Sequence, residues 1–155
     1  MTAQMVIAVA LGAVAIFEDL RSRNIPNWIP IAALVAGLAW NVAAHGWHGA
    51  VSSLLGAVAG FLVFLIFYLL GGMGGGDIKL MGGFGAVIGI QHVLAAAFAA
   101  ALCGALIAVA VIGGRALRKW RRGSSSTEAR PAEPESESIP YAPAIAAGVW
   151  LSLIA

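Results

Sequence analysis

The sequence predicts an all-α fold, a polytopic membrane bundle of about six transmembrane helices. The first observation is composition, because 61% of the 155 residues are hydrophobic and only 10% are charged, as in chains whose solvent is lipid. The second is a series of apolar runs that approach the roughly 20 residues needed to cross a bilayer. The third is the placement of the nine Lys and Arg residues, which all fit one side of such a bundle.

Six apolar runs supply the expected spans, and together they make residues 1–155 a single integral-membrane domain. In order, the runs cover residues 3–17, 28–44, 50–70, 78–91, 93–112 and 141–155. The first span stops before Pro26, which forces the residue in front of it away from helical conformation. The fourth is the shortest, so we expect its start to be recessed below the membrane surface.

The basic residues predict the topology of these spans. Six crossings place every Lys and Arg on one side, which the positive-inside rule makes cytoplasmic. Both termini are then outside, with outer turns near residues 45–49 and 91–92. The polar stretch at about 114–139 is rich in Arg, Ser, Pro and Glu, and we expect it to be a flexible cytoplasmic loop.

Several classes of site are disfavoured. The basic residues are scattered among the spans, so no nucleic-acid partner is expected. The single cysteine, Cys103, allows neither an intrachain disulfide nor a cysteine-rich zinc site. His45 and His48 offer only two metal ligands, so we expect no metal and no cofactor. The oligomeric state is left open.

Two aspartates lie at the boundaries of apolar runs. Asp19 follows the first run, at a helix C-terminus, where the helix dipole disfavours a negative charge. An ion pair with Arg21 or Arg23 is the simpler alternative. Asp77 precedes the fourth run, where it would also be a good N-cap. The predicted topology puts both acids at the cytoplasmic boundary, and buried acids in membrane proteins usually have a function. We therefore predict that Asp19 and Asp77 are catalytic.

A close pair of carboxyl groups suggests a reaction. Two such groups cannot both ionise easily, so the pair is expected to share one proton. One carboxylate can then take a proton from water as the water attacks an amide, while the other protonates the developing oxyanion. This is the chemistry of an aspartic protease, and it needs neither a metal nor a covalent nucleophile.

The residues next to the aspartates are candidates for binding a peptide. Glycines have no Cβ, so another backbone can approach them closely, and an extended peptide could pair with them in a strand-like way. A hinge between two spans is the alternative interpretation of these glycines. Lys79 could orient a substrate carboxylate or simply anchor its helix at the interface. The full substrate-binding set is Gly74, Gly75, Gly76, Lys79, Asn24, Pro26 and Asn27.

Two motifs resemble those of a known family. Residues 19–27, Asp-Leu-Arg-Ser-Arg-Asn-Ile-Pro-Asn, resemble the Asp-then-Ile-Pro-Asn signature of type IV prepilin peptidases. Residues 74–80, Gly-Gly-Gly-Asp-Ile-Lys-Leu, resemble their Gly-Xaa-Gly-Asp signature, and Ile139-Pro140-Tyr141-Ala142-Pro143 is a weaker third match. The resemblance implies catalytic aspartates at Asp19 and Asp77. It also implies prepilin-like substrates, cut typically after a glycine at the cytoplasmic face of the bacterial inner membrane.

The resemblance also indicates a branch of the family. Larger members carry a further N-terminal region with a zinc-binding cysteine tetrad that supports N-methylation, and this sequence shows neither. It looks like the short, peptidase-only branch that serves Flp (Tad) pili, related to archaeal preflagellin peptidases, and we expect no methyltransferase domain. The Gly-Xaa-Gly-Asp signature is shared with presenilin-like intramembrane proteases, whose aspartates lie deeper, and that interpretation is the lesser one.

The alternative is a non-catalytic membrane transporter or assembly subunit that uses Asp19 and Asp77 as an ion or proton site. Intramembrane acids do serve such relays. A relay should place acids at several depths, whereas the acids near the membrane here all lie near one face. The sequence therefore favours the protease, whose partners would be prepilin-like proteins and the lipid bilayer.

Overall fold

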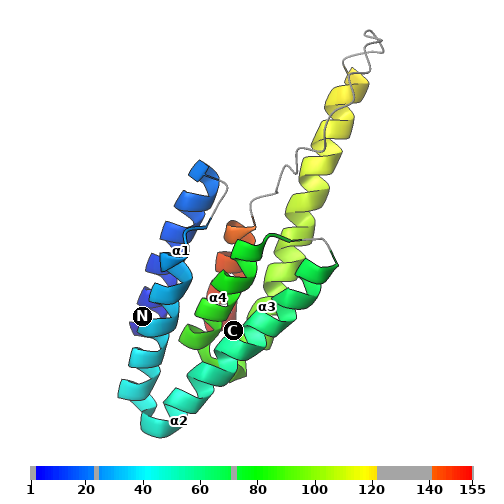
Figure 1. Cartoon of the computed structure of the whole chain (residues 1–155). Helices are drawn as coiled ribbons and strands as arrows, with labels where there is room; N and C mark the ends of the chain where they lie inside the picture. The colour runs from blue at the N-terminus through cyan, green and yellow to red at the C-terminus, as the bar shows by residue number, and fades with distance from the viewer. Residues whose placement is uncertain (1–2, 23–24, 71–72, 122–140, 155) are drawn as a thin grey trace.

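The structure, a computed structural model, describes residues 3–22, 25–70, 73–121 and 141–154. These form helices joined by short non-helical residues, and none of them is in a strand. The four helices, in order, are α1 (Ala3–Ser22), α2 (Trp28–Leu69), α3 (Gly75–Arg121) and α4 (Ala142–Ile154) (Figure 1). By length and composition, α1, α2 and residues Gly75–Val111 of α3 could each cross a membrane, and α4 is a shorter apolar helix. The predicted all-α class is confirmed for these residues.

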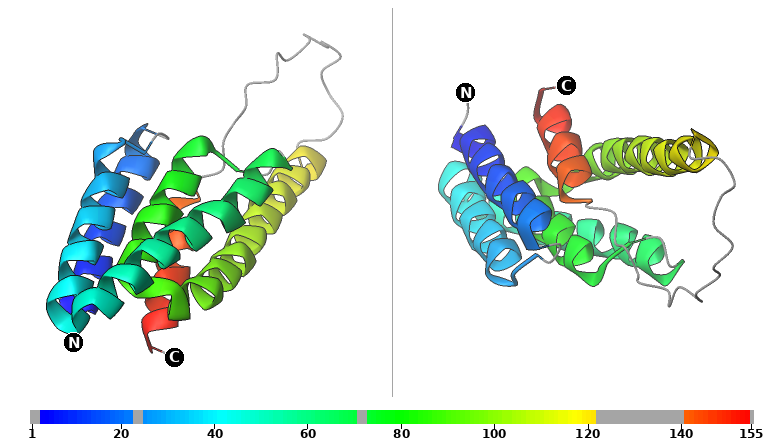
Figure 2. Two further views of the ribbon diagram at one scale, coloured as in Figure 1. Left: turned by 60° about the horizontal axis from the view of Figure 1, so that its bottom comes forward. Right: turned by 90° about the horizontal axis from the view of Figure 1, so that it is seen from above.

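Two of the helices bend sharply at a glycine. Gly46 in α2 has φ 59° and ψ −137°, and Gly89 in α3 has φ 74° and ψ 173°. Only glycine adopts such a positive φ at no steric cost. The bends divide the two helices into segments 28–45, 47–69, 75–88 and 90–121, so the bundle has six segments that run alternately in opposite directions (Figures 1 and 2).

The bends lie where the sequence predicted turns between spans. Gly46 is within the predicted turn near residues 45–49, and Gly89 comes two residues before the turn predicted at 91–92. Both chain ends lie at the same end of the bundle as the two bends (Figures 1 and 2). That arrangement agrees with the alternating topology, while six membrane crossings and outer termini stay predictions.

Helix α3 is longer than the sequence predicted. It continues to Arg121, so the first residues of the loop expected at about 114–139 are helical and that boundary was wrong. Ala, Leu, Arg and Lys are strong helix formers, and an established helix extends at little cost where they follow it. Residues 122–140, the rest of the predicted loop, lie outside the described residues.

The bend at Gly89 is held by polar side chains from three other segments. Asn41 donates through Nδ2 to the carbonyls of Ala86 (3.0 Å) and Val87 (3.1 Å), and Ser53 Oγ donates to Ala86 (2.8 Å). These two carbonyls are the ones that residues 90 and 91 would use in an unbroken helix.

Two further hydrogen bonds complete the network at this bend. Gln4 Nε2 of α1 donates to the carbonyl of Val87 at 2.8 Å, and the amide of Ile90 donates to Ser52 Oγ at 3.4 Å. Lipid can satisfy none of these groups, so side chains must do it.

Glycines let the two bent helices pack closely. A Cβ on Gly56 would collide with the backbone of Gly85 and Gly89, and a Cβ on Gly60 would meet the carbonyl of Met81 at 2.7 Å. Gly56 and Gly60 are four residues apart, as are Gly85 and Gly89, and this spacing is typical of membrane helices that pack closely.

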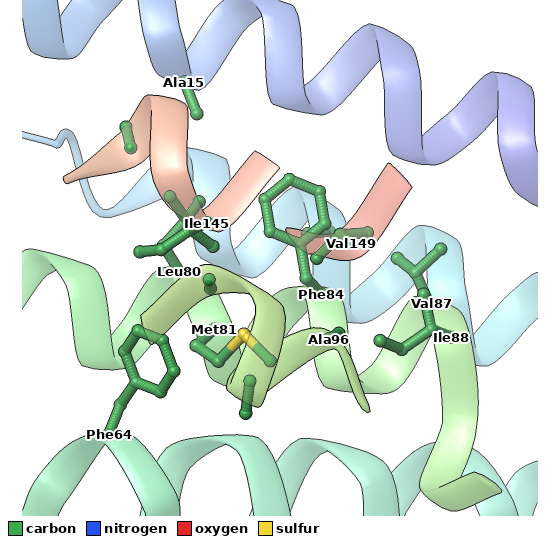
Figure 3. Close-up of a cluster of buried hydrophobic side chains, with 14 of the residues drawn as sticks. Ala15, Phe64, Leu80, Met81, Phe84, Val87, Ile88, Ala96, Ile145 and Val149 are labelled. Atoms are coloured by element: carbon green, nitrogen blue, oxygen red, sulfur yellow. The ribbon is translucent and has the colours of Figure 1, made fainter. Parts of the chain in front are cut away.

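The apolar core lies between the first half of α3 and its neighbours. Leu80, Met81 and Phe84 of α3 are fully buried, together with Ile145 and Val149 of α4. Figure 3 shows these side chains pointing toward one another, with Phe64 of α2 beside Met81 and Ala15 of α1 above α4. The segment that follows Asp77 is therefore the best-buried segment of the bundle.

Replacing Asn41 with leucine should destabilise the protein. Leucine is similar in size but leaves the carbonyls at the Gly89 bend without these donors, which costs about 1–3 kcal/mol for buried groups. Thermal unfolding of the detergent-purified protein measures the loss. The control is Ser152→Ala, because Ser152 is also buried but donates only to Val149 within its own helix. Equal losses in both variants would contradict a special role for Asn41.

Candidate active site

Asp19 lies in the last turn of α1 and is 6% exposed. Its Oδ2 accepts a hydrogen bond of 3.1 Å from the amide of Ala142, the first residue of α4. The first amides of a helix have no partner within that helix, so Asp19 caps α4 from a different helix. The positive end of the α4 dipole also stabilises the carboxylate there. This offsets the negative end of the α1 dipole, which disfavours the charge of Asp19.

Asp77 lies in the first turn of α3 and is 7% exposed. The amide of Gly74 donates to its Oδ2 at 3.2 Å, while the amide of Asp77 donates to the carbonyl of Gly74, also at 3.2 Å. This reciprocal arrangement is one half of a capping box. The sequence placed Asp77 at the N-cap itself, which was wrong because Gly75 and Gly76 join the helix ahead of it.

The fold brings the two acids to the same end of the bundle, at the end of α1 and the start of α3 (Figure 1). They lie close enough for the charge of Asp19 to act on Asp77. Each carboxyl group is held by one backbone amide, through Oδ2 in both cases. Two buried carboxyl groups whose charges interact resist ionising together, so one can stay protonated while the other is ionised, which is the requirement for general acid–base chemistry.

Comparison with known proteins now bears on this site. Residues 5–109, which include both aspartates, match the sequence profile of the type IV leader peptidase family. The chain belongs to the type IV leader peptidase family. No solved structure matches it.

Curated relatives of this family differ in how much of the chain they match. The chain is 34% identical over 154 residues to a prepilin leader peptidase/N-methyltransferase of Bacillus subtilis, covering 96% of this chain and 54% of that protein. The counterpart from Aeromonas hydrophila is 29% identical over 145 residues, 89% of this chain and 44% of that protein. A preflagellin peptidase of Methanococcus voltae is 35% identical over 89 residues, 53% of this chain and 38% of that protein. The chain thus spans about half the length of the first relatives, or less.

The two motifs of this leader peptidase family member contact each other. Gly76 packs against Ile25, since a Cβ on Gly76 would lie 3.3 Å from that of Ile25. Further along the two motifs, Lys79 Nζ donates to Asn27 Oδ1 at 3.0 Å. These contacts hold the segment that follows Asp19 against the start of α3.

The remaining predicted binding residues lie around these contacts. Gly74 and Gly75 are exposed and Gly76 is half-buried. Pro26 is half-buried, and its carbonyl accepts from the amide of Ile29 at 3.1 Å in the first turn of α2. Asn24 lies outside the described residues.

Sequence reasoning missed the part played by Ala142 in this leader peptidase family member. The amide of an alanine carries no signal of its own, although the Ile139-Pro140-Tyr141-Ala142-Pro143 match marked the region. The carbonyl of Tyr141 accepts from Ile145 at 3.0 Å, so α4 begins at the residue that contacts Asp19. Only the folded arrangement shows that contact.

Removing the carboxyl group of Asp19 should loosen the start of α4. Asp19→Ala takes away the acceptor for the Ala142 amide, and the loss of a helix cap costs about 0.5–2 kcal/mol. Hydrogen–deuterium exchange at the start of α4 should therefore accelerate by roughly two- to thirtyfold. Asp19→Asn, which keeps an oxygen acceptor, should exchange nearly as slowly as the wild type.

The matched control is Glu18→Ala, which removes a neighbouring acid that is half-buried and makes no side-chain hydrogen bond in the part of the chain described. Its exchange at α4 should equal that of the wild type. Exchange that is unchanged in Asp19→Ala would mean that the bond to Ala142 contributes nothing to α4.

Proposed function

We propose that this chain is a membrane aspartic endopeptidase that removes the leader peptide of type IV prepilins. The observation that carries the proposal is the pair of buried carboxyl groups, Asp19 and Asp77, that the fold brings together from two separate motifs. Membership of the type IV leader peptidase family supports it. Its relatives in Bacillus subtilis and Aeromonas hydrophila are named as prepilin leader peptidases.

The proposed reaction uses one shared proton. The ionised carboxylate takes a proton from water as the water oxygen bonds to the scissile carbonyl carbon, and the protonated carboxyl group gives its proton to the carbonyl oxygen. When the tetrahedral intermediate collapses, the C–N bond breaks and the leaving amine takes the proton of the carboxyl group that had deprotonated the water. The other carboxylate takes back a hydroxyl proton as the carbonyl forms again, so the pair regains its one shared proton. The amides of Gly74 and Ala142 hold Oδ2 of Asp77 and of Asp19, so in the proposed reaction Oδ1 of each acid exchanges protons with water and substrate.

The substrate-binding segment in this proposal is Gly74, Gly75 and Gly76. It adjoins Asp77, and its first two residues are exposed, so an extended peptide can lie along their backbone. Lys79, Asn27, Pro26 and Asn24 contribute indirectly. The hydrogen bond from Lys79 to Asn27 holds the segment after Asp19 in place, and so positions both acids.

The proposal includes a location and a substrate branch. Both aspartates lie at the end of the bundle where α1 ends and α3 begins, the end to which the positive-inside rule assigns the cytoplasm. A prepilin would keep its basic leader in the cytoplasm of the bacterium and its apolar helix in the inner membrane, so that the scissile bond meets the acids at the boundary. We assign the Flp type of prepilin on the resemblance of the sequence to the peptidase-only branch.

Replacing either acid by its amide should abolish cleavage. The chain is co-expressed with a panel of Flp-type prepilins, and leader loss is followed by gel shift and N-terminal sequencing. Asp19→Asn and Asp77→Asn should each reduce cleavage by about 10²- to 10⁴-fold, because each removes a general acid–base group. Asparagine is isosteric and still accepts a hydrogen bond, so membrane insertion should not change.

The control for this experiment is Glu18→Gln, which neutralises an acid one residue away from Asp19 and should cleave like the wild type. Near-normal turnover in either aspartate variant would refute the dyad. If no prepilin is cut by the wild type, proton flux in liposomes, compared between wild type and the two variants, tests the rival assignment of the acids to an ion or proton site.

A side chain at Gly75 should weaken substrate binding without harming the fold. Gly75 is exposed, and a Cβ there would meet only Tyr68, at 3.9 Å, so Gly75→Leu has room. In the proposed complex the leucine would keep the peptide backbone away, and the loss of about one hydrogen bond should raise KM roughly tenfold with little change in kcat.

Gly114→Leu is the matched control for Gly75→Leu, because Gly114 is also exposed and helical, and a Cβ added there would have nothing within 4 Å. It should cleave with wild-type kinetics. A wild-type KM in Gly75→Leu would remove Gly75 from the substrate-binding segment.

A further inference from the structure

An apolar groove runs along the face of α3 that points away from the aspartates. It has a volume of about 540 Å³ and lies between both halves of α2 and the first half of α3. Gly82 and Gly83 form its floor, with Ile31 and Leu34 on one wall and Val58 and Leu62 on the other. Side chains three and four apart share a helix face, so Lys79, Gly82 and Gly83 lie on one side of α3.

Asp77 lies on the opposite side of the same helix. It shares its face with Leu80, Met81 and Phe84, which are fully buried in the core. The groove and the acid pair are therefore separated by the body of α3. A molecule in the groove would therefore not contact the acid pair.

The groove is polar only at one end. Asn27 and Lys79 line it where α2 and α3 begin, and the other residues that line it are apolar. From Asn27 to Leu34 the wall extends seven residues, or about 10 Å at the rise of an α-helix. A site with one polar end and apolar walls along its length fits an amphiphile, with its head at Lys79 and its tail along Leu34.

The charge at the polar end selects an anionic head. Lys79 is exposed and is the one charged residue among those that line the groove. One of its three N–H donors is used on Asn27 Oδ1, and that bond holds the ammonium group at the mouth. The other donors are available to a phosphate, in a charge-assisted hydrogen bond of the stronger kind.

The floor explains why a tail fits here. Gly82 and Gly83 present no side chain, and the exposed side chains of Ile31, Val58 and Leu62 stand on either side. A packed protein helix is 10–12 Å across, whereas a single acyl chain is narrow enough to lie between these walls. The flanking helices α2 and α3 are both long and apolar enough to cross a membrane, so lipid is expected to meet this surface.

We propose that the groove binds one anionic phospholipid, with its phosphate at Lys79 and an acyl chain over Gly82 and Gly83. This binding does not depend on the proposed peptidase activity, and its test needs no substrate.

The test measures lipid retention by native mass spectrometry. The full chain is reconstituted with equal amounts of phosphatidylglycerol and phosphatidylcholine that carry the same acyl chains, then released from detergent micelles in the spectrometer. The wild type should retain one phosphatidylglycerol in preference to phosphatidylcholine. Lys79→Gln should reduce that preference about tenfold, because the charge-assisted contact is lost.

A control and a second variant distinguish the effect of the Lys79 charge from the effect of the shape of the groove. Arg21→Gln removes an exposed basic residue at the same end of the bundle that does not line the groove, and should retain phosphatidylglycerol like the wild type. Gly82→Leu fills the floor, where a Cβ would have its nearest neighbour, the Cβ of Phe61, at 3.4 Å, and should lose both lipids. Thermal unfolding of this variant checks that it is folded.

Three outcomes would overturn the proposal. One is an unchanged preference for phosphatidylglycerol in Lys79→Gln. Another is equal loss in Arg21→Gln, which would make the effect one of general surface charge. The third is one-for-one displacement of the lipid by an added prepilin, which would assign the groove to the substrate.

Discussion

The interaction on which the rest of the bundle depends is the set of hydrogen bonds that closes the bend at Gly89. A helix that reverses direction inside an apolar bundle frees carbonyl groups that lipid cannot satisfy. Asn41, Ser53 and Gln4 donate to those carbonyls. These hydrogen bonds connect α1 and both halves of α2 to α3 at the bend. Once the bend is closed, the first half of α3 is fixed at the centre, where its large side chains meet those of α4.

The other end of the same segment carries Asp77, and there polar groups serve a different purpose. At the bend, side chains satisfy backbone carbonyls; at the acid pair, backbone amides of Gly74 and Ala142 hold side-chain carboxyl groups. Two helix N-termini, of α3 and α4, thus converge on two acids, and each supplies a donor together with the positive end of its dipole. A membrane bundle can keep two carboxyl groups buried because these termini are there to receive them.

Much of this was predictable because the signals are local. The apolar runs, the turns near Gly46 and Gly89, the glycine spacing and the two aspartates can each be read from a few neighbouring residues. The roles of Asn41, Ser53, Gln4 and Ala142 could not be read in that way, because each depends on which distant segment lies opposite. Two helix boundaries were predicted wrongly. Gly75 and Gly76 were expected to precede α3 but form its first turn, and the residues up to Arg121 extend α3 instead of starting a loop.

The glycines of α3 have a consequence for depth. Gly85 meets the backbone of Gly56, and Gly83 meets that of Pro30, so the segment rests on main chain along two of its sides. A helix that contacts neighbouring backbone at its glycines cannot slide along its own axis. Any shift would replace a glycine at such a contact by a residue whose side chain would collide with the neighbouring backbone. The distance from the Gly89 bend to Asp77 is therefore constant, and the acid keeps a set level along the axis of the bundle. In the proposed reaction, that level decides which bond of an inserted peptide can be hydrolysed.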